Sequence, residues 1–186
     1  RTLSVAAELS EWDSVVNVPK VKTHRQFVFT GATKNLYGCV VGKRKFIRHN
    51  LCGNDPVRFA QMILANARAI DCVAHIGDGI TAMHVLGPRG GEPYALNAVI
   101  VADDPLVHDV AQCYLIGLDP ADTPLFQALS DEQMSAVNQA AAARLRESGL
   151  EPADDFVHAP LIHISFSPWA VARSGLRTLR YKLAQS

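Results

Sequence analysis

Two Asp-Pro pairs constrain the fold of this chain more than any other sequence feature. In Asp55-Pro56 and Asp104-Pro105, the aspartate is a favourable helix N-cap and the proline suits the first helical position. The first pair predicts a helix that ends near Arg68, and the second predicts a helix that ends before Gly117. Both helices follow polar residues and alternate with apolar runs. The chain is therefore expected to alternate between strands and helices.

The apolar runs supply the expected strands. They are residues 15–18, 26–30, 69–76, 95–102 and 156–164. The run at 95–102 is apolar apart from Asn97, which is typical of a strand that is covered on both faces. Strands that alternate with helices favour an α/β fold, with a single mixed or mostly parallel sheet and helices packed on its faces.

Further helices are predicted after residue 120. Thr123-Pro124 starts a short one, and the capping box of Ser130 and Gln133 starts a long one that Gly149 ends. Ser167-Pro168 opens a last helix with an apolar stripe, formed by Trp169, Ala172, Leu176, Leu179 and Leu183. A stripe of this kind packs in a core in most proteins, although it also suits docking on a protein partner. Residues 1–186 are expected to form one domain.

The distribution of charge indicates the kind of ligand. The chain has 18 Lys and Arg residues and 18 Asp and Glu residues, so its formal net charge is +0. Eight of these cations lie between Ser14 and Asn54, where no acidic residue occurs. This local positive field predicts a small anionic ligand, whereas the near-neutral pI of about 7.2 disfavours nucleic acid. No apolar run is long enough to span a membrane, no signal-peptide pattern occurs, and the four cysteines are scattered, so a cytoplasmic protein is expected.

Residues that could bind an anion gather in two basic motifs and the turn between them. The sequence TGATKN at residues 30–35 combines a glycine, hydroxyls, a lysine and an amide, which suit a phosphate or carboxylate. The expected ligand-binding residues are Lys20, Lys22, Thr30, Gly31, Lys34, Asn35 and Lys45. The alternative is a polar turn between two strands with a solvated lysine.

Acid–base or metal chemistry is assigned to histidines and to carboxylates at the ends of strands. His24, His49 and Asp78 are the candidate catalytic residues, because ligands of open α/β sheets bind at the carboxyl ends of strands. A divalent metal is a candidate cofactor, with ligands drawn from His24, His49, Asp78, His84 and Asp103. Against a metal, no two histidines have the spacing of a ligand motif such as HExxH, and lone histidines are commonly structural.

Five ordered motifs carry a resemblance to a known family. They are NVPKVKTH, TGATKNLYG, the lysine-rich turn that leads to His49, GDGITAMHVLGPRGGEP and VADDPLVHDVAQCYLIGLDP. Together they resemble domain of unknown function 362 (DUF362) over residues 13–129, which leaves 130–186 as a C-terminal helical extension. The resemblance implies an α/β domain whose biochemical function is not settled. His84 stands where the family usually has a glutamate, and the cysteine clusters of its iron–sulfur members are absent, so no iron–sulfur cluster is expected.

Two functions of different classes follow. In the first, the chain is a redox or group-transfer enzyme that fixes an anionic substrate or cofactor with lysines and uses histidine and aspartate for acid–base or metal chemistry. In the second, it is a non-catalytic binding module for an acidic partner, a nucleotide or a metal. Both depend on the basic motifs and Asp78 meeting in one place.

Overall fold

The sheet is built around one long central strand. The computed structural model describes residues 4–41, 52 and 55–162 of the chain. The described strands are β1 (Val15–Asn17), β2 (Lys20–His24), β3 (Val28–Thr30), β4 (Cys72–His84), β5 (Glu92–Tyr94) and β6 (Ala98–Ala102). They form a six-stranded sheet in which β4 pairs with four of the other strands.

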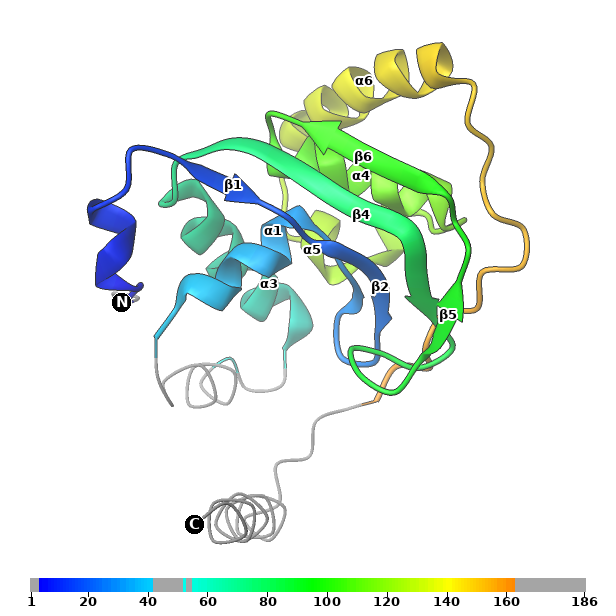
Figure 1. Ribbon diagram of the computed structural model, residues 1–186, viewed down its shortest axis with the longest axis horizontal. Coiled ribbons are helices and arrows are strands. Elements are labelled where there is room, and N and C mark those ends of the chain that lie inside the picture. Colours follow the sequence, from blue (N-terminus) through cyan, green and yellow to red (C-terminus); the bar gives the residue numbers. More distant parts are fainter. Residues whose placement is uncertain (1–3, 42–51, 53–54, 163–186) are drawn as a thin grey trace, which may run out of the picture.

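The register shows which strands share an edge of β4. Strands β1 and β2 run parallel to β4, and they follow one another along one edge (Figure 1). Strands β6 and β5 run antiparallel to β4 along the other edge, and β3 is antiparallel to β2. Asp78 has Lys20 on one side and Val99 on the other. The sheet is mixed, as the sequence predicted.

The helices begin and end where local signals predict. The described α-helices are α1 (Ala32–Asn35), α3 (Pro56–Arg68), α4 (Pro105–Leu115), α5 (Pro124–Gln127) and α6 (Asp131–Ser148). Single turns of 3-10 helix occur at Ala7–Ser10, Leu36–Cys39 and Pro120–Asp122. Asp55 and Asp104 cap α3 and α4 through their carboxylates, and the predicted capping box opens α6. Gly149 ends α6 in the left-handed conformation. The α/β class is confirmed.

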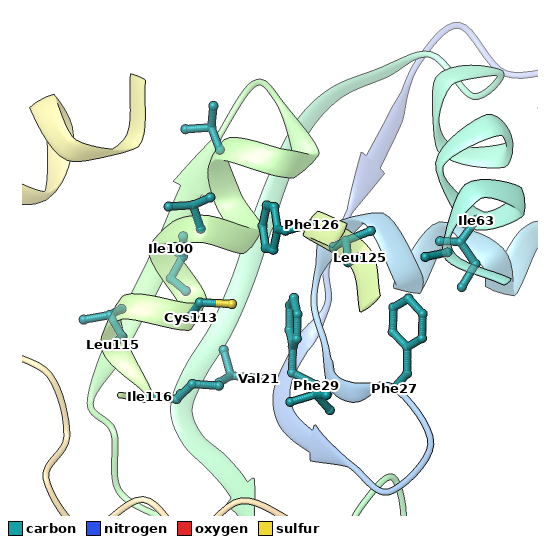
Figure 2. Close-up of a cluster of buried hydrophobic side chains, with 14 of the residues drawn as sticks. Val21, Phe27, Phe29, Ile63, Ile100, Cys113, Leu115, Ile116, Leu125 and Phe126 are labelled. Atoms are coloured by element: carbon teal, nitrogen blue, oxygen red, sulfur yellow. The ribbon is translucent and has the colours of Figure 1, made fainter. Parts of the chain in front are cut away.

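The main core lies between the sheet and the helices α3, α4 and α5. Figure 2 shows the side chains of Val21 and Ile100 from the sheet meeting those of Ile63, Leu125 and Phe126 from the helices. Phe27 and Phe29 close this cluster beside β3, and both are fully buried. Burying this much apolar surface on one side of the sheet fixes which side chains of each strand face inwards.

The sequence placed Asp78 at the end of a strand, and this was wrong. Strand β4 continues through Gly77, Asp78 and Gly79 as far as His84. The two glycines serve close packing instead of a turn, because a Cβ on Gly77 would lie 2.3 Å from Nε2 of His108. A Cβ on Gly79 would lie 2.8 Å from the carbonyl oxygen of Ala98. Asp78 is therefore a mid-strand residue.

Two other expectations about strands were wrong. Strand β6 is covered on one face only, since its burial alternates along the strand. Residues 156–162 form no strand, although Val157 and Ile162 make single backbone hydrogen bonds to neighbouring segments. The rest of that expected strand and the predicted helix from Ser167 lie outside the described residues. Within the described part of the chain, no helix is long and apolar enough to cross a membrane.

Candidate functional site

Lys22 of β2 is close enough to two other cations, Lys34 and Arg89, for their charges to interact. We call Lys22, Lys34 and Arg89 the basic triad. Lys22 lies on β2 and pairs in register with Thr30 of β3. Because α1 begins two residues after Thr30, its Lys34 returns to the same end of the sheet, where its ammonium lies 5.9 Å from the ring centre of Phe27.

Arg89 reaches the triad because its loop packs tightly against the end of β2. The carbonyl of Gly87 accepts a hydrogen bond from the amide of Arg25, with a nitrogen–oxygen distance of 3.2 Å. A Cβ on Gly87 would lie 1.8 Å from the carbonyl oxygen of Thr23, so only glycine allows this approach. Two residues further on, Arg89 is close enough to Lys22 for its charge to act on that lysine.

The basic triad has no counter-ion among the residues described. None of its three side chains forms an ion pair with a described carboxylate. Removal from water lowers the pKa of Lys34 to about 8, and the positive charge of Lys22 adds to this effect. Removal from water also lowers the pKa of Lys22, with Arg89 as the second cause. The triad is thus a concentrated positive field in a partly desolvated place.

The TGATKN turn already holds an anion of the chain itself. The carboxylate of Asp109, a fully buried residue of α4, accepts hydrogen bonds from the amides of Ala32 and Thr33 at 2.5 and 3.0 Å. It also contacts Nδ1 of His108 at 3.0 Å. A Cβ on Gly31 would lie 2.1 Å from this carboxylate, which explains the glycine. These two backbone amides therefore fasten α1 to α4.

A buried polar network continues from this turn into the sheet. The side-chain amide of Asn17 donates to the carbonyl of Ala32 at 2.9 Å and contacts Nδ1 of His75 at 3.0 Å. Asn35 donates to the side-chain oxygen of Asn17 at 2.9 Å. Burial lowers the pKa of His75, with the nearby His108 as the second cause. Asn35 was predicted to bind a ligand, but its side-chain amide forms a hydrogen bond within the protein.

Lys20 and Asp78 pair with each other on the outer face of the sheet. Nζ of Lys20 lies 2.7 Å from Oδ2 of Asp78, and the two side chains are 41% and 42% exposed. This hydrogen bond from Lys20 is the main reason why the pKa of the Asp78 carboxyl is lowered. The structure therefore brings two predicted site residues into contact, but their opposite charges neutralise each other.

His24 and His84 lie at the ends of β2 and β4. His24 is buried, and its Nδ1 accepts a hydrogen bond from the amide of Gln26 at 3.1 Å, which orients the imidazole within the turn. His84 packs its ring against Tyr94 and Phe156, and its Nδ1 accepts from the amide of Val157 at 3.4 Å. Both rings have structural contacts.

The candidate metal ligands do not converge in the described structure. Asp103 follows β6 next to the amino-terminal half of β4, is 77% exposed, and lies 3.7 Å from Arg144. Ala102, the residue before Asp103, pairs in register with His75 of β4. His84 lies nine residues further along β4, which corresponds to a distance of roughly 30 Å. No group of three metal-binding side chains occurs among the described residues. His49 and Lys45 lie outside them.

The sequence alone did not predict the contacts made by Arg89 and Asp109. Arg89 sits in a Gly- and Pro-rich loop, and nothing local shows that this loop folds back onto β2. Asp109 lies one turn into a helix, where an acidic residue usually faces solvent. One signal was available. His108, Asp109 and Gln112 are buried polar residues of one helix, and buried polar side chains require hydrogen-bond partners.

Comparison with known proteins identifies the family of this chain. The sequence model of the family described as domain of unknown function (DUF362) matches residues 1–114, and the chain belongs to that family. It is similar to the thylakoid-associated protein sll1697 of Synechocystis sp., with 36% identity over 126 residues. That alignment covers 68% of this chain but only 39% of the relative. No solved structure matches.

Proposed function

We propose that this chain is a binding domain for a small anion, and that the basic triad of Lys22, Lys34 and Arg89 holds the anion. The observation that carries the proposal is the gathering of three cations without a described carboxylate partner. Like charges repel, and moving an ammonium out of water disfavours its charged form. An anion between these groups would remove both penalties.

The chemistry of the triad favours a ligand that carries several negative oxygens. A guanidinium such as that of Arg89 offers two parallel N–H donors to a phosphate or carboxylate, and each ammonium adds a point charge. Lys22 lies two residues before the carboxyl end of β2, and α/β sheets commonly bind ligands near such ends. Phosphate, pyrophosphate and tricarboxylates such as citrate are therefore suitable probes.

Calorimetric titration with these three anions tests the proposal. Lys22→Gln, Lys34→Gln and Arg89→Gln should each weaken binding about 10- to 100-fold, as expected for loss of one charge-assisted hydrogen bond. Arg146→Gln is the matched control, because it removes an exposed cation of α6 and the same unit of net charge. Absence of binding by all three anions, or an equal loss in Arg146→Gln, would refute the site.

A group-transfer reaction at the same site is the second candidate. His24 favours it, because it lies two residues after Lys22 on β2 and its Nδ1 is an acceptor, so Nε2 carries the proton in the neutral ring. Histidine is the residue most often used for general acid–base catalysis. In NMR spectra, the imidazole signals of His24 should shift when pyrophosphate is added. Unchanged signals at saturating ligand would leave His24 without a role in the chemistry.

A further inference from the structure

One face of the sheet is apolar but exposed. In β6, Val99 and Val101 are 51% and 62% exposed, while the alternate residues face the core. Val16 of β1 and Ile80 of β4 are 50% and 59% exposed. We call this surface the outer face, and its exposed aliphatic side chains are those of Val16, Val18, Ile80, Val99 and Val101.

The outer face is continuous across the sheet. The register places Val101 beside Ile76 and Val99 beside Asp78, so these side chains project from the same side of neighbouring strands. Among the described residues between them, Lys20 and Asp78 are charged, and the two neutralise each other. Helices α1, α3, α4 and α5 lie on the opposite side of the sheet (Figure 1). A sheet face that meets water permanently would carry polar side chains in these positions.

We propose that residues 163–186 of this chain cover the outer face. Their sequence carries an apolar stripe at helical spacing, and a stripe of this kind requires an apolar surface to pack on. The stripe consists of Trp169, Ala172, Leu176, Leu179 and Leu183. In α/β folds, helices that cover the second face of the sheet usually come from the same chain.

The end of the described chain puts this segment within reach of the outer face. The amide of Ile162 donates to the carbonyl of Arg25 at 2.8 Å, so residue 163 begins beside the end of β2. Four or five residues then precede Ser167-Pro168. A helix of about 18 residues is about 27 Å long, and it fits along β4, whose 13 residues extend for roughly 43 Å.

A segment of the same chain has an advantage over a second copy. Tethering at Ile162 gives the segment an effective concentration in the millimolar range, far above that of another molecule in dilute solution.

The fluorescence of Trp169 in the 186-residue chain tests the proposal. The chain has two tryptophans, so Trp12→Phe leaves Trp169 as the reporter. Its emission should be blue-shifted and resist quenching by acrylamide. Val101→Lys on the outer face should raise the quenching constant several-fold and shift the emission to the red. Val157→Lys is the control, because Val157 is similarly exposed but lies outside the sheet.

A second variant separates docking from folding. Leu176→Lys changes only the segment, so it should expose Trp169 while the far-UV circular dichroism and melting of the rest remain close to those of the parent. Molar mass from light scattering completes the test. A monomer with a protected Trp169 supports the proposal. A parent protein with a solvated Trp169 overturns it, and so does a dimer that Val101→Lys dissociates without changing the quenching.

Discussion

Lys34→Met should stabilise the ligand-free protein, and the gain should depend on pH in a defined direction. The ordinary pKa of a lysine is 10.5, whereas that of Lys34 is about 8 in the folded state. At about 1.4 kcal/mol per pH unit, this difference corresponds to roughly 3 kcal/mol that the charged ammonium costs the folded state. The variant removes the ammonium and retains an unbranched side chain of similar length.

The sign of the pH dependence follows from proton binding by the two states. Between pH 8 and 10.5, Lys34 is largely protonated in the unfolded chain and largely neutral in the folded one. The unfolded state therefore binds more protons, so the stability of the wild-type protein rises with pH in this interval. Below pH 8, Lys34 is protonated in both the folded and the unfolded state, so the full cost of the buried ammonium remains. The advantage of Lys34→Met should thus be largest near pH 7 and shrink by roughly 3 kcal/mol at pH 10.5.

Urea unfolding at a series of pH values from 7 to 10.5 measures this change. The buffers should contain no phosphate or polycarboxylate, because the proposed ligand would stabilise the wild-type protein. Arg146→Met serves as the control, since it replaces an exposed cation of α6 with the same residue. A stability difference between Lys34→Met and wild type that stays constant with pH would refute the reasoning. Pyrophosphate added at pH 7 should reverse the ranking of the two proteins.

Three further substitutions test the internal contacts. Gly31→Ala should destabilise the protein by about 3 kcal/mol in thermal or urea unfolding, because the added methyl group would meet the Asp109 carboxylate. Gly38→Ala is the control and should not lower the stability, because a Cβ at Gly38 would meet open space. Asp109→Asn should lower the free energy of unfolding by roughly 3 kcal/mol, since an amide nitrogen would face a backbone donor; an unchanged midpoint would contradict the clamp. Asp78→Asn should lower it by less than about 1 kcal/mol at pH 7, because its pair with Lys20 is exposed. Since pairing lowers the pKa of Asp78, this small difference should disappear as the pH falls below 3.8.

Local chemistry in the sequence was sufficient for the helices. The aspartate N-caps at residues 55 and 104, the capping box at Ser130 and the glycine at 149 each act within one helical turn. Contacts of that range can be deduced without knowing the rest of the fold. The same is true of the alternation that gave the α/β class, and the order of the motifs pointed to the family that the comparisons then confirmed.

The sequence alone thus determined the fold class, most helix boundaries and the presence of a basic segment. The tertiary structure decided which charges are neutralised and which are not. It paired Lys20 with Asp78, filled the TGATKN turn with Asp109, and brought Arg89 to Lys22. The physical reason is that these interactions join residues far apart in the chain. Their partners depend on strand register and on loops packing across the sheet, which residue type and spacing do not specify.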